Sequence, residues 1–137
     1  MAGSSGYSGT PLAKKLGFRE GSRVFAMRAP PDYMSLLEPL PPGLAFEERL
    51  TGRTDCVHVF CDRRDRLKAD LTSLRSSIRS DCVVWVSWPK KSSKAPTDVT
   101  EDAIRELALP LGFVDVKVCA VSELWSGLKL VIRKELR

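Results

Sequence analysis

The positive charges best placed to bind a ligand follow the most apolar stretch of the chain. Residues 82–88 form an apolar and aromatic run typical of a strand that is buried on both faces. Pro89 ends this run, and the loop that follows holds Lys90, Lys91 and Lys94 among serines. In open α/β sheets, ligands bind beyond the carboxyl ends of the parallel strands. The lysine loop is therefore the first place to look for a site.

Two other expected strands also end in arginine. Arg28 ends the first of them, and Arg63 and Arg64 follow the strand at 55–61. Because the carboxyl ends of parallel strands meet at one edge of a sheet, these cations should form a rim around a crevice. Free amides of the helix that begins at Arg63 would also attract an anion. The candidate ligand-binding residues are Arg28, Arg63, Arg64, Trp88, Lys90, Lys91, Ser92, Lys94 and Trp125.

Each of these candidates also has a purely structural interpretation. The cations can be solvated loop charges paired with Asp32, Asp62, Asp65 and Asp98. Trp88 and Trp125 would offer flat faces to a base or ring if they flank the same crevice, but tryptophans at such positions also pack the top of a sheet. Both interpretations stay open at this point.

Catalytic chemistry is poorly represented. Cys61 is the one candidate nucleophile, because a strand end before a helix and beside Arg63 and Arg64 is an environment that lowers a thiol pKa. His58 is the only histidine and lies mid-strand among apolar residues, which predicts a core histidine bonded to a neighbour. No acid/base pair stands out, so the sequence leans towards a protein that is not an enzyme.

The four cysteines all lie in apolar, strand-like runs, at positions 56, 61, 82 and 119. They form no CxxC pair, so a zinc site is not supported. Although an even count would allow two disulfides, the core-like surroundings favour buried free thiols.

Composition sets broad limits on partners. The 137 residues suit one domain, and 22 Lys+Arg against 17 Asp+Glu give a net charge of +5. This surplus suits a small anionic ligand or nucleic acid, but it is less dense than the stripes of dedicated nucleic-acid binders, and it also suits an ordinary soluble protein. Residues 1–9 form a Gly/Ser leader that lacks the features of a signal peptide, and no apolar run reaches bilayer length. We therefore expect a cytoplasmic protein without a membrane partner.

Hydrophobic periodicity predicts alternating strands and helices. The expected strands cover residues 23–28, 45–50, 55–61, 82–88, 113–121 and 128–133. The expected helices cover residues 10–17, 62–78 and 100–111, with one or two helical turns at 32–37. Asp62, with Asp65, should cap the second helix, and Thr100 the third. This order predicts a single three-layer Rossmann-like α/β domain over residues 10–137, with a mainly parallel sheet and a C-terminal antiparallel hairpin.

The layout from 55 to 133 resembles the later half of class I methyltransferases, and residues 16–24 resemble the entry to their first strand. After that strand the family has an acidic, glycine-rich turn that approaches the methyl donor. Residues 27–32 hold two prolines and no glycine at the corresponding place. The resemblance therefore implies the fold but argues against methyl transfer. No cofactor is predicted, and S-adenosylmethionine is disfavoured.

Over nearly its whole length the chain resembles the bacterial domain-of-unknown-function 3052 family, on residues 6–12, 88–92, 117–121 and 125–129. That resemblance implies no activity. Three hypotheses for function follow from the sequence. The first is a non-catalytic or regulatory module that binds a small anionic ligand or a protein partner at the strand-end crevice. The second is nucleic-acid binding through the same rim. The third is a divergent methyltransferase or a thiol-dependent enzyme.

Overall fold

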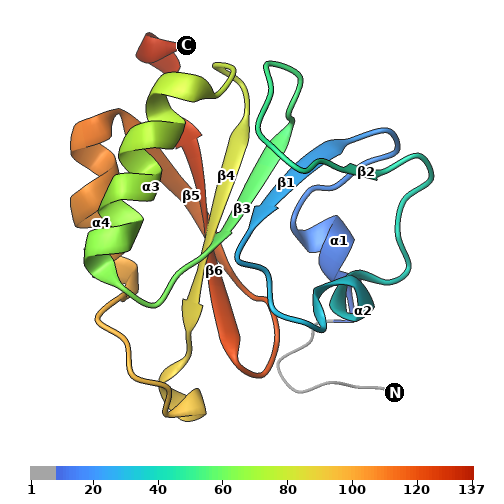
Figure 1. Cartoon of the computed structure of the whole chain (residues 1–137), viewed down its shortest axis with the longest axis horizontal. Coiled ribbons are helices and arrows are strands. Elements are labelled where there is room, and N and C mark those ends of the chain that lie inside the picture. The colour runs from blue at the N-terminus through green and yellow to red at the C-terminus, as the bar shows by residue number, and fades with distance from the viewer. Residues whose placement is uncertain (1–8) are drawn as a thin grey trace.

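Six strands form one mixed sheet in the computed structural model, which describes residues 9–137 (Figure 1). The strands are β1 (Arg23–Met27), β2 (Ala45–Phe46), β3 (Cys56–Phe60), β4 (Val83–Pro89), β5 (Phe113–Ala120) and β6 (Trp125–Ile132). Their order across the sheet is β2-β1-β3-β4-β6-β5. The first four are parallel to one another, whereas β6 runs antiparallel to both β4 and β5. The predicted fold class is confirmed. The expected leader, apart from Gly9, lies outside the described residues.

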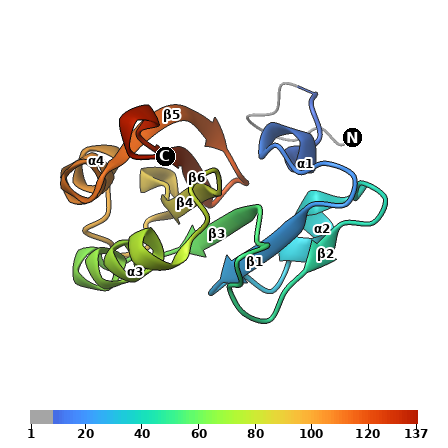
Figure 2. The same cartoon turned by 90° about the horizontal axis from the view of Figure 1, so that it is seen from above.

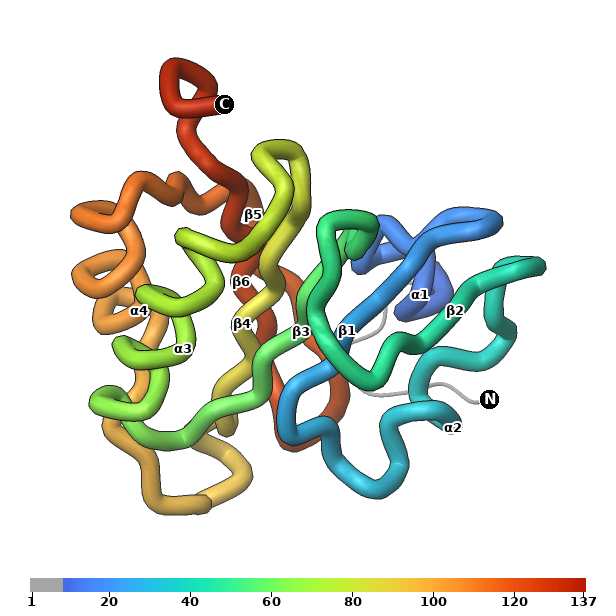
Figure 3. The backbone as a smooth tube through the Cα atoms, turned by 45° about the horizontal axis from the view of Figure 1, so that its top comes forward, coloured from blue at the N-terminus to red at the C-terminus, as the bar shows by residue number. Residues whose placement is uncertain are grey.

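Helices cover both faces of this sheet (Figure 2). The α-helices are α1 (Leu12–Lys15), α2 (Tyr33–Leu37), α3 (Arg64–Ser77) and α4 (Glu101–Ala108), and the 3-10 turns are η1 (Lys91–Ser93), η2 (Leu109–Leu111) and η3 (Lys134–Leu136). Leu67, Leu71 and Leu74 of α3 recur at helical spacing and pack, together with Ile104 of α4, on one face of the sheet. The short helices α1 and α2 pack on the other face (Figure 3). None of the helices in residues 9–137 is long and apolar enough to span a bilayer.

The two long helices begin differently. Thr100 caps α4 as predicted, because its side chain accepts a hydrogen bond from the amide of Ala103 at 3.0 Å. The predicted cap of α3 by Asp62 is wrong, since Arg63 occupies the N-cap position and makes no side-chain cap. Instead, Asp98 accepts a hydrogen bond from the amide of Arg64 at 2.7 Å. The amino end of α3 is therefore capped by an acid from a distant loop, whereas the local sequence predicted a cap by the adjacent Asp62.

The turn after β1 differs from a glycine-rich turn in its side chains. Arg28 stands at the end of β1 with a φ of +57°, in the left-handed region that glycine favours. A bend that glycine commonly makes is thus made here by an arginine. As a result, a long cationic side chain lies over the edge of the sheet where a glycine would leave bare backbone.

Candidate functional site

The carboxyl ends of β1, β3 and β4 converge at one edge, as the parallel pairing requires. Two side-chain bonds tie the loops of this edge together. Arg28 donates from Nε to the carbonyl of Phe60 at 3.0 Å, and Thr97 donates from its hydroxyl to the carbonyl of Asp62 at 2.8 Å. This edge lies at the bottom of Figure 1, and the predicted site residues lie at or just beyond the strand ends that reach it.

The three arginines of the predicted rim form ion pairs with neighbouring acids. Arg28 pairs with Asp70 of α3. Arg63 lies 3.6 Å from Asp65, and the guanidinium of Arg64 lies 2.8 Å from Glu106 of α4. These pairs agree with the interpretation of the arginines as loop charges that pair with neighbouring acids. Of the partners, Asp65 was foreseen, whereas Asp70 and Glu106 sit on helix faces that no local spacing connects with the strand ends.

The lysines behave differently from the arginines. Lys90, Lys91 and Lys94 line a pocket of about 430 Å³ beyond the end of β4. Within residues 9–137, no carboxylate lies at ion-pair distance from any of the three ammonium groups. Because their charges are not neutralised by the protein, these lysines keep the functional interpretation open. Ser92 lies beside them on η1 but does not line the pocket.

The lysine loop is held in a defined conformation. The amide of Lys90 donates to the carbonyl of Leu124 at 2.9 Å, which ties the loop to the β5–β6 turn. Ser93 donates from its hydroxyl to the carbonyl of Lys90 at 2.7 Å, and Lys94 then turns the chain with a φ of +59°. The loop thus presents its ammonium groups from a fixed backbone, which reduces the entropy lost on binding.

The opposite wall of this pocket comes from residues that the sequence did not assign to a site. These are Ala95, Thr97, Val99, Thr100 and Glu101. Glu101 pairs with Arg105, which also pairs with Asp102 and Asp115, and the hydroxyls of Thr97 and Thr100 already make backbone hydrogen bonds. Their position near the lysines could have been inferred from the short connection between the lysine loop and α4. The polar groups left to meet a ligand are chiefly the lysines.

Trp88 and Trp125 lie on opposite faces of the sheet. Trp88, which is 9 % exposed, forms part of the pocket wall and packs into the core beneath α3 and α4. The ring of Trp125 packs edge-on against Phe60, with centroids 5.0 Å apart, on the face covered by α1 and α2. Since Trp88 faces Ser126 across the β4–β6 pair, the neighbouring Trp125 must point to the other side. The two rings therefore do not flank one crevice.

Cys61 is closed off from substrate. The residue is 3 % exposed, and its thiol donates to the carbonyl of Arg63 at 3.2 Å. Burial raises the pKa of the other three thiols, to about 12 at Cys82. All four cysteines are free, as the apolar runs predicted.

His58 is the buried core histidine that its mid-strand position predicted. Its Nδ1 lies 2.8 Å from the hydroxyl of Tyr33, and its Nε2 lies 2.8 Å from the hydroxyl of Ser87. Burial lowers the pKa of the imidazole to about 3, so the ring is neutral near neutral pH. Tyr33, His58 and Ser87 are all buried, and none of them lines a pocket described above.

The fold is that of class I, S-adenosylmethionine-type methyltransferases. Over 90 % of its length the chain superposes on 90 % of a candidate type 11 methyltransferase from Sulfolobus solfataricus, with a TM-score of 0.64 and 12 % identity. It matches 92 % of its length to 70 % of the fibrillarin of Aeropyrum pernix, solved with S-adenosyl-L-methionine, with a TM-score of 0.58 and 11 % identity.

The mitomycin 7-O-methyltransferase MmcR gives a TM-score of 0.62 at 11 % identity, but the chain spans only about half (49 %) of that enzyme. Neither a family model nor a curated protein sequence matches this chain. At these identities the likeness establishes the fold. It leaves the ligand to be argued from the residues of the site.

The residues after β1 do not fit a methyl donor held as the resemblance would imply. In a Rossmann-like fold, the turn after the first strand has to offer bare backbone to the ligand. Here Arg28 stands at the start of that turn, and its side chain reaches the carbonyl of Phe60 and the carboxylate of Asp70. Pro30 and Pro31 follow in this turn, and neither has an amide N–H to donate. The donor-binding turn of the family is therefore replaced by an ion-paired arginine.

Proposed function

We propose that this chain is a divergent protein of the methyltransferase fold that binds a small anionic ligand in the pocket beside the lysine loop. The observation that carries the proposal is the set of three unpaired lysines around that pocket, at the carboxyl end of a central strand. On residue resemblance we also place the chain in the bacterial domain-of-unknown-function 3052 family.

The chemistry of the lining narrows the class of ligand. Ammonium groups act as point charges and suit phosphate or carboxylate oxygens. The edge of Trp88 and the side chain of Val99 add an apolar wall. A phosphorylated or carboxylated small molecule with a modest apolar part would satisfy both.

A second candidate is a divergent methyltransferase. The comparisons favour it over a non-catalytic module, because the solved neighbours named above include methyltransferases and a fibrillarin solved with the methyl donor. The charges favour the first proposal, since S-adenosylmethionine carries a sulfonium and an ammonium against one carboxylate. A positively charged donor gains little from a pocket lined by lysines. S-adenosylmethionine remains a plausible ligand through the fold, and the experiment has to include it.

Ligand-induced thermal stabilisation and isothermal titration separate these candidates. We expect adenosine 5′-monophosphate or citrate to raise Tm, because a ligand at a hundred times its Kd adds about 2.7 kcal/mol to the free energy of unfolding. The double variant Lys90→Ala/Lys91→Ala should weaken that binding at least about tenfold, the effect of losing roughly 1.4 kcal/mol of charge-assisted contact.

The matched control is Lys68→Ala/Lys134→Ala, which removes the same charge from exposed positions away from the pocket. Stabilisation by S-adenosylmethionine or S-adenosylhomocysteine alone would replace the first proposal with the second. Equal affinity of the anionic probes for the lysine double variant and the wild type would show that Lys90 and Lys91 do not bind these probes, and would refute the first proposal.

A further inference from the structure

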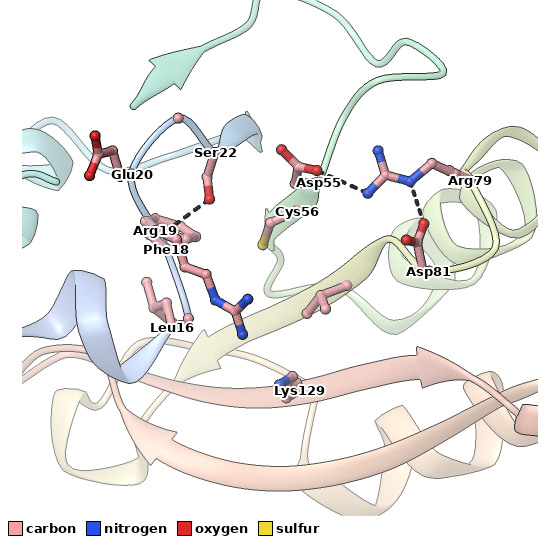
Figure 4. A pocket seen from close by; sticks show the side chains of 13 residues that line it. Leu16, Phe18, Arg19, Glu20, Ser22, Asp55, Cys56, Arg79, Asp81 and Lys129 are labelled. Carbon is pink, nitrogen blue, oxygen red and sulfur yellow. Dashed lines mark hydrogen bonds and ion pairs between the residues drawn. The ribbon is translucent and has the colours of Figure 1, made fainter. Parts of the chain in front are cut away.

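A second cavity lies at the opposite edge of the sheet, at the amino ends of β1, β3 and β4 (Figure 4). Its volume is about 460 Å³. The loop between α1 and β1, the entry to β3 and the turn before β4 form its walls, and Lys129 of β6 completes its base. The carboxyl-end pocket shares none of these residues, so this cavity needs its own explanation.

Two cations face this cavity without an acidic partner. Figure 4 shows the guanidinium of Arg19 extending from the α1–β1 loop into the space above Lys129. No carboxylate in the described part of the chain pairs with either group. Glu20, the acid next to Arg19 in sequence, points away from the guanidinium in the same view. Lys129 is partly exposed on β6.

Two of the three acids that line the cavity, Asp55 and Asp81, are engaged with other groups. Asp55 accepts from Arg79 at 2.9 Å and from the backbone amide of Arg23 at 2.8 Å. Asp81 forms an ion pair with the same Arg79, which lowers the pKa of that carboxyl. These contacts fix both acids on the far wall, so they are not drawn across the cavity to Arg19 or Lys129. The lining charges outside these contacts are those of Arg19, Lys129 and Glu20, of which only Glu20 is negative.

Four apolar side chains also contribute to the cavity lining, whose exposed surface is otherwise mostly polar. Leu16, Phe18 and Cys56 are buried side chains at its floor, with Val83 beside them. The indole N–H of Trp85 donates to the carbonyl of Leu16 at 2.9 Å and so fixes the end of α1 against the sheet. This small apolar area beside two unpaired cations suits a ligand that has one anionic group and a compact apolar body.

We propose that this amino-end cavity is a second binding site, for small organic anions in which a carboxylate or phosphate is attached to an apolar body. Arg19 contributes a planar fork that can hold two oxygens at once, and Lys129 contributes a point charge from the opposite side. The apolar body lies on Leu16, Phe18 and Val83. The proposal does not depend on the function proposed for the carboxyl-end pocket, because the two sites share no residue.

Backbone-amide NMR titrations with phenyl phosphate, benzoate and inorganic phosphate test this site. We expect phenyl phosphate and benzoate to shift the amides of residues 18–22, 55–56 and 129, with inorganic phosphate binding more weakly because it lacks the apolar body. The stronger of the two aromatic probes identifies the preferred anion. Shifts confined to residues 88–101 would assign the probes to the other pocket and overturn the proposal.

Matched variants make the test specific. Arg19→Gln and Lys129→Met each keep the side-chain stem, and each should weaken binding of the preferred probe at least about fivefold. Lys68→Gln removes one charge from the exposed face of α3 and should leave the affinity unchanged. Lys129→Arg keeps the charge and should retain binding, which separates a ligand contact from a packing effect. Affinities that stay at the wild-type value in both Arg19→Gln and Lys129→Met would refute the site.

Discussion

At the scale of single residues, His58 shows how a reactive side chain can be used for structure alone. Each ring nitrogen has one hydroxyl partner, so either neutral tautomer satisfies both Tyr33 and Ser87. A protonated ring would have two donors and would be buried without a counter-charge. The fold therefore selects the neutral form, and burial also raises the pKa of Tyr33 and keeps its phenol protonated.

This selection predicts a pH dependence of stability. In the folded protein the pKa of His58 is lowered to about 3, whereas an unfolded histidine has a pKa of about 6.5. Between these two pKa values, His58 is protonated in the unfolded chain but not in the folded chain. The free energy of unfolding therefore falls as the pH falls. We expect a loss of about 2 kcal/mol between pH 7 and pH 5, measured by urea unfolding.

His58→Gln is the control, because glutamine does not titrate and the chain has no other histidine. The loss between about pH 7 and pH 5 should disappear in that variant, since acids with lowered pKa values such as Asp81 and Asp115 act only at lower pH. Direct NMR titration of the ring in the wild type covers the case in which the variant does not fold. A midpoint above about pH 6 would contradict the prediction.

At the scale of elements, local patterns predicted what local forces decide. The helical stripe of Leu67, Leu71 and Leu74 and the cap by Thr100 both appear in the structure, because period and capping act within a few residues. The partner of the α3 amino end could not be found in this way. Asp98 reaches the amide of Arg64 from 34 residues away, through a loop whose course depends on the whole sheet.

For the candidate site, too, the sequence predicted some features and missed others. Strand order placed the lysine loop and the arginines at one edge, and the structure confirms that convergence. The sequence did not reveal that Asp70 and Glu106 would neutralise Arg28 and Arg64, because both acids lie on helices whose rotation is set by core packing. The amino-end cavity was missed altogether. Arg19 and Lys129 are 110 residues apart in the chain and meet only after the β4–β6 pair forms.

The junction between η2 and β5 gives an element-scale prediction. Gly112 has a φ of +103°, and a Cβ at this position would lie 2.8 Å from Leu136 and 3.0 Å from the Nε of Arg75. Gly112→Ala combines a left-handed backbone with this crowding, so it should lower the free energy of unfolding by about 1–3 kcal/mol in urea titrations. Gly52→Ala is the matched control, because a Cβ there meets nothing within 4 Å. Equal stability of the two variants would contradict this explanation.

At the scale of the whole molecule, the net charge of +5 is distributed unevenly. Ten ion pairs among the described residues engage Arg23, Arg28, Arg63, Arg64, Arg79, Arg105 and Arg133. None of these pairs engages Lys90, Lys91 or Lys94, so their charges remain free to act at a distance. At the carboxyl edge they gather only at the end of β4, so the edge has a short cationic patch where the sequence predicted a continuous rim.

This distribution limits how the protein can bind nucleic acid. Each phosphate neutralised on a single strand contributes a slope of about −0.7 to log K against log salt concentration. Contacts from Lys90, Lys91 and Lys94 alone would therefore give a slope of about −2, whereas the six cations of the predicted rim would give about −4.

We expect fluorescence anisotropy with a labelled single-stranded oligonucleotide to show a slope no steeper than about −2 between roughly 50 and 200 mM salt. Lys90→Ala/Lys91→Ala should leave a slope shallower than about −1, while Lys68→Ala/Lys134→Ala should leave the wild-type slope unchanged. A slope near −4 in the wild type that falls only to about −3 in the lysine loop variant would mean that the ion-paired arginines open to bind phosphates, and the nucleic-acid hypothesis would then displace the small-anion proposal.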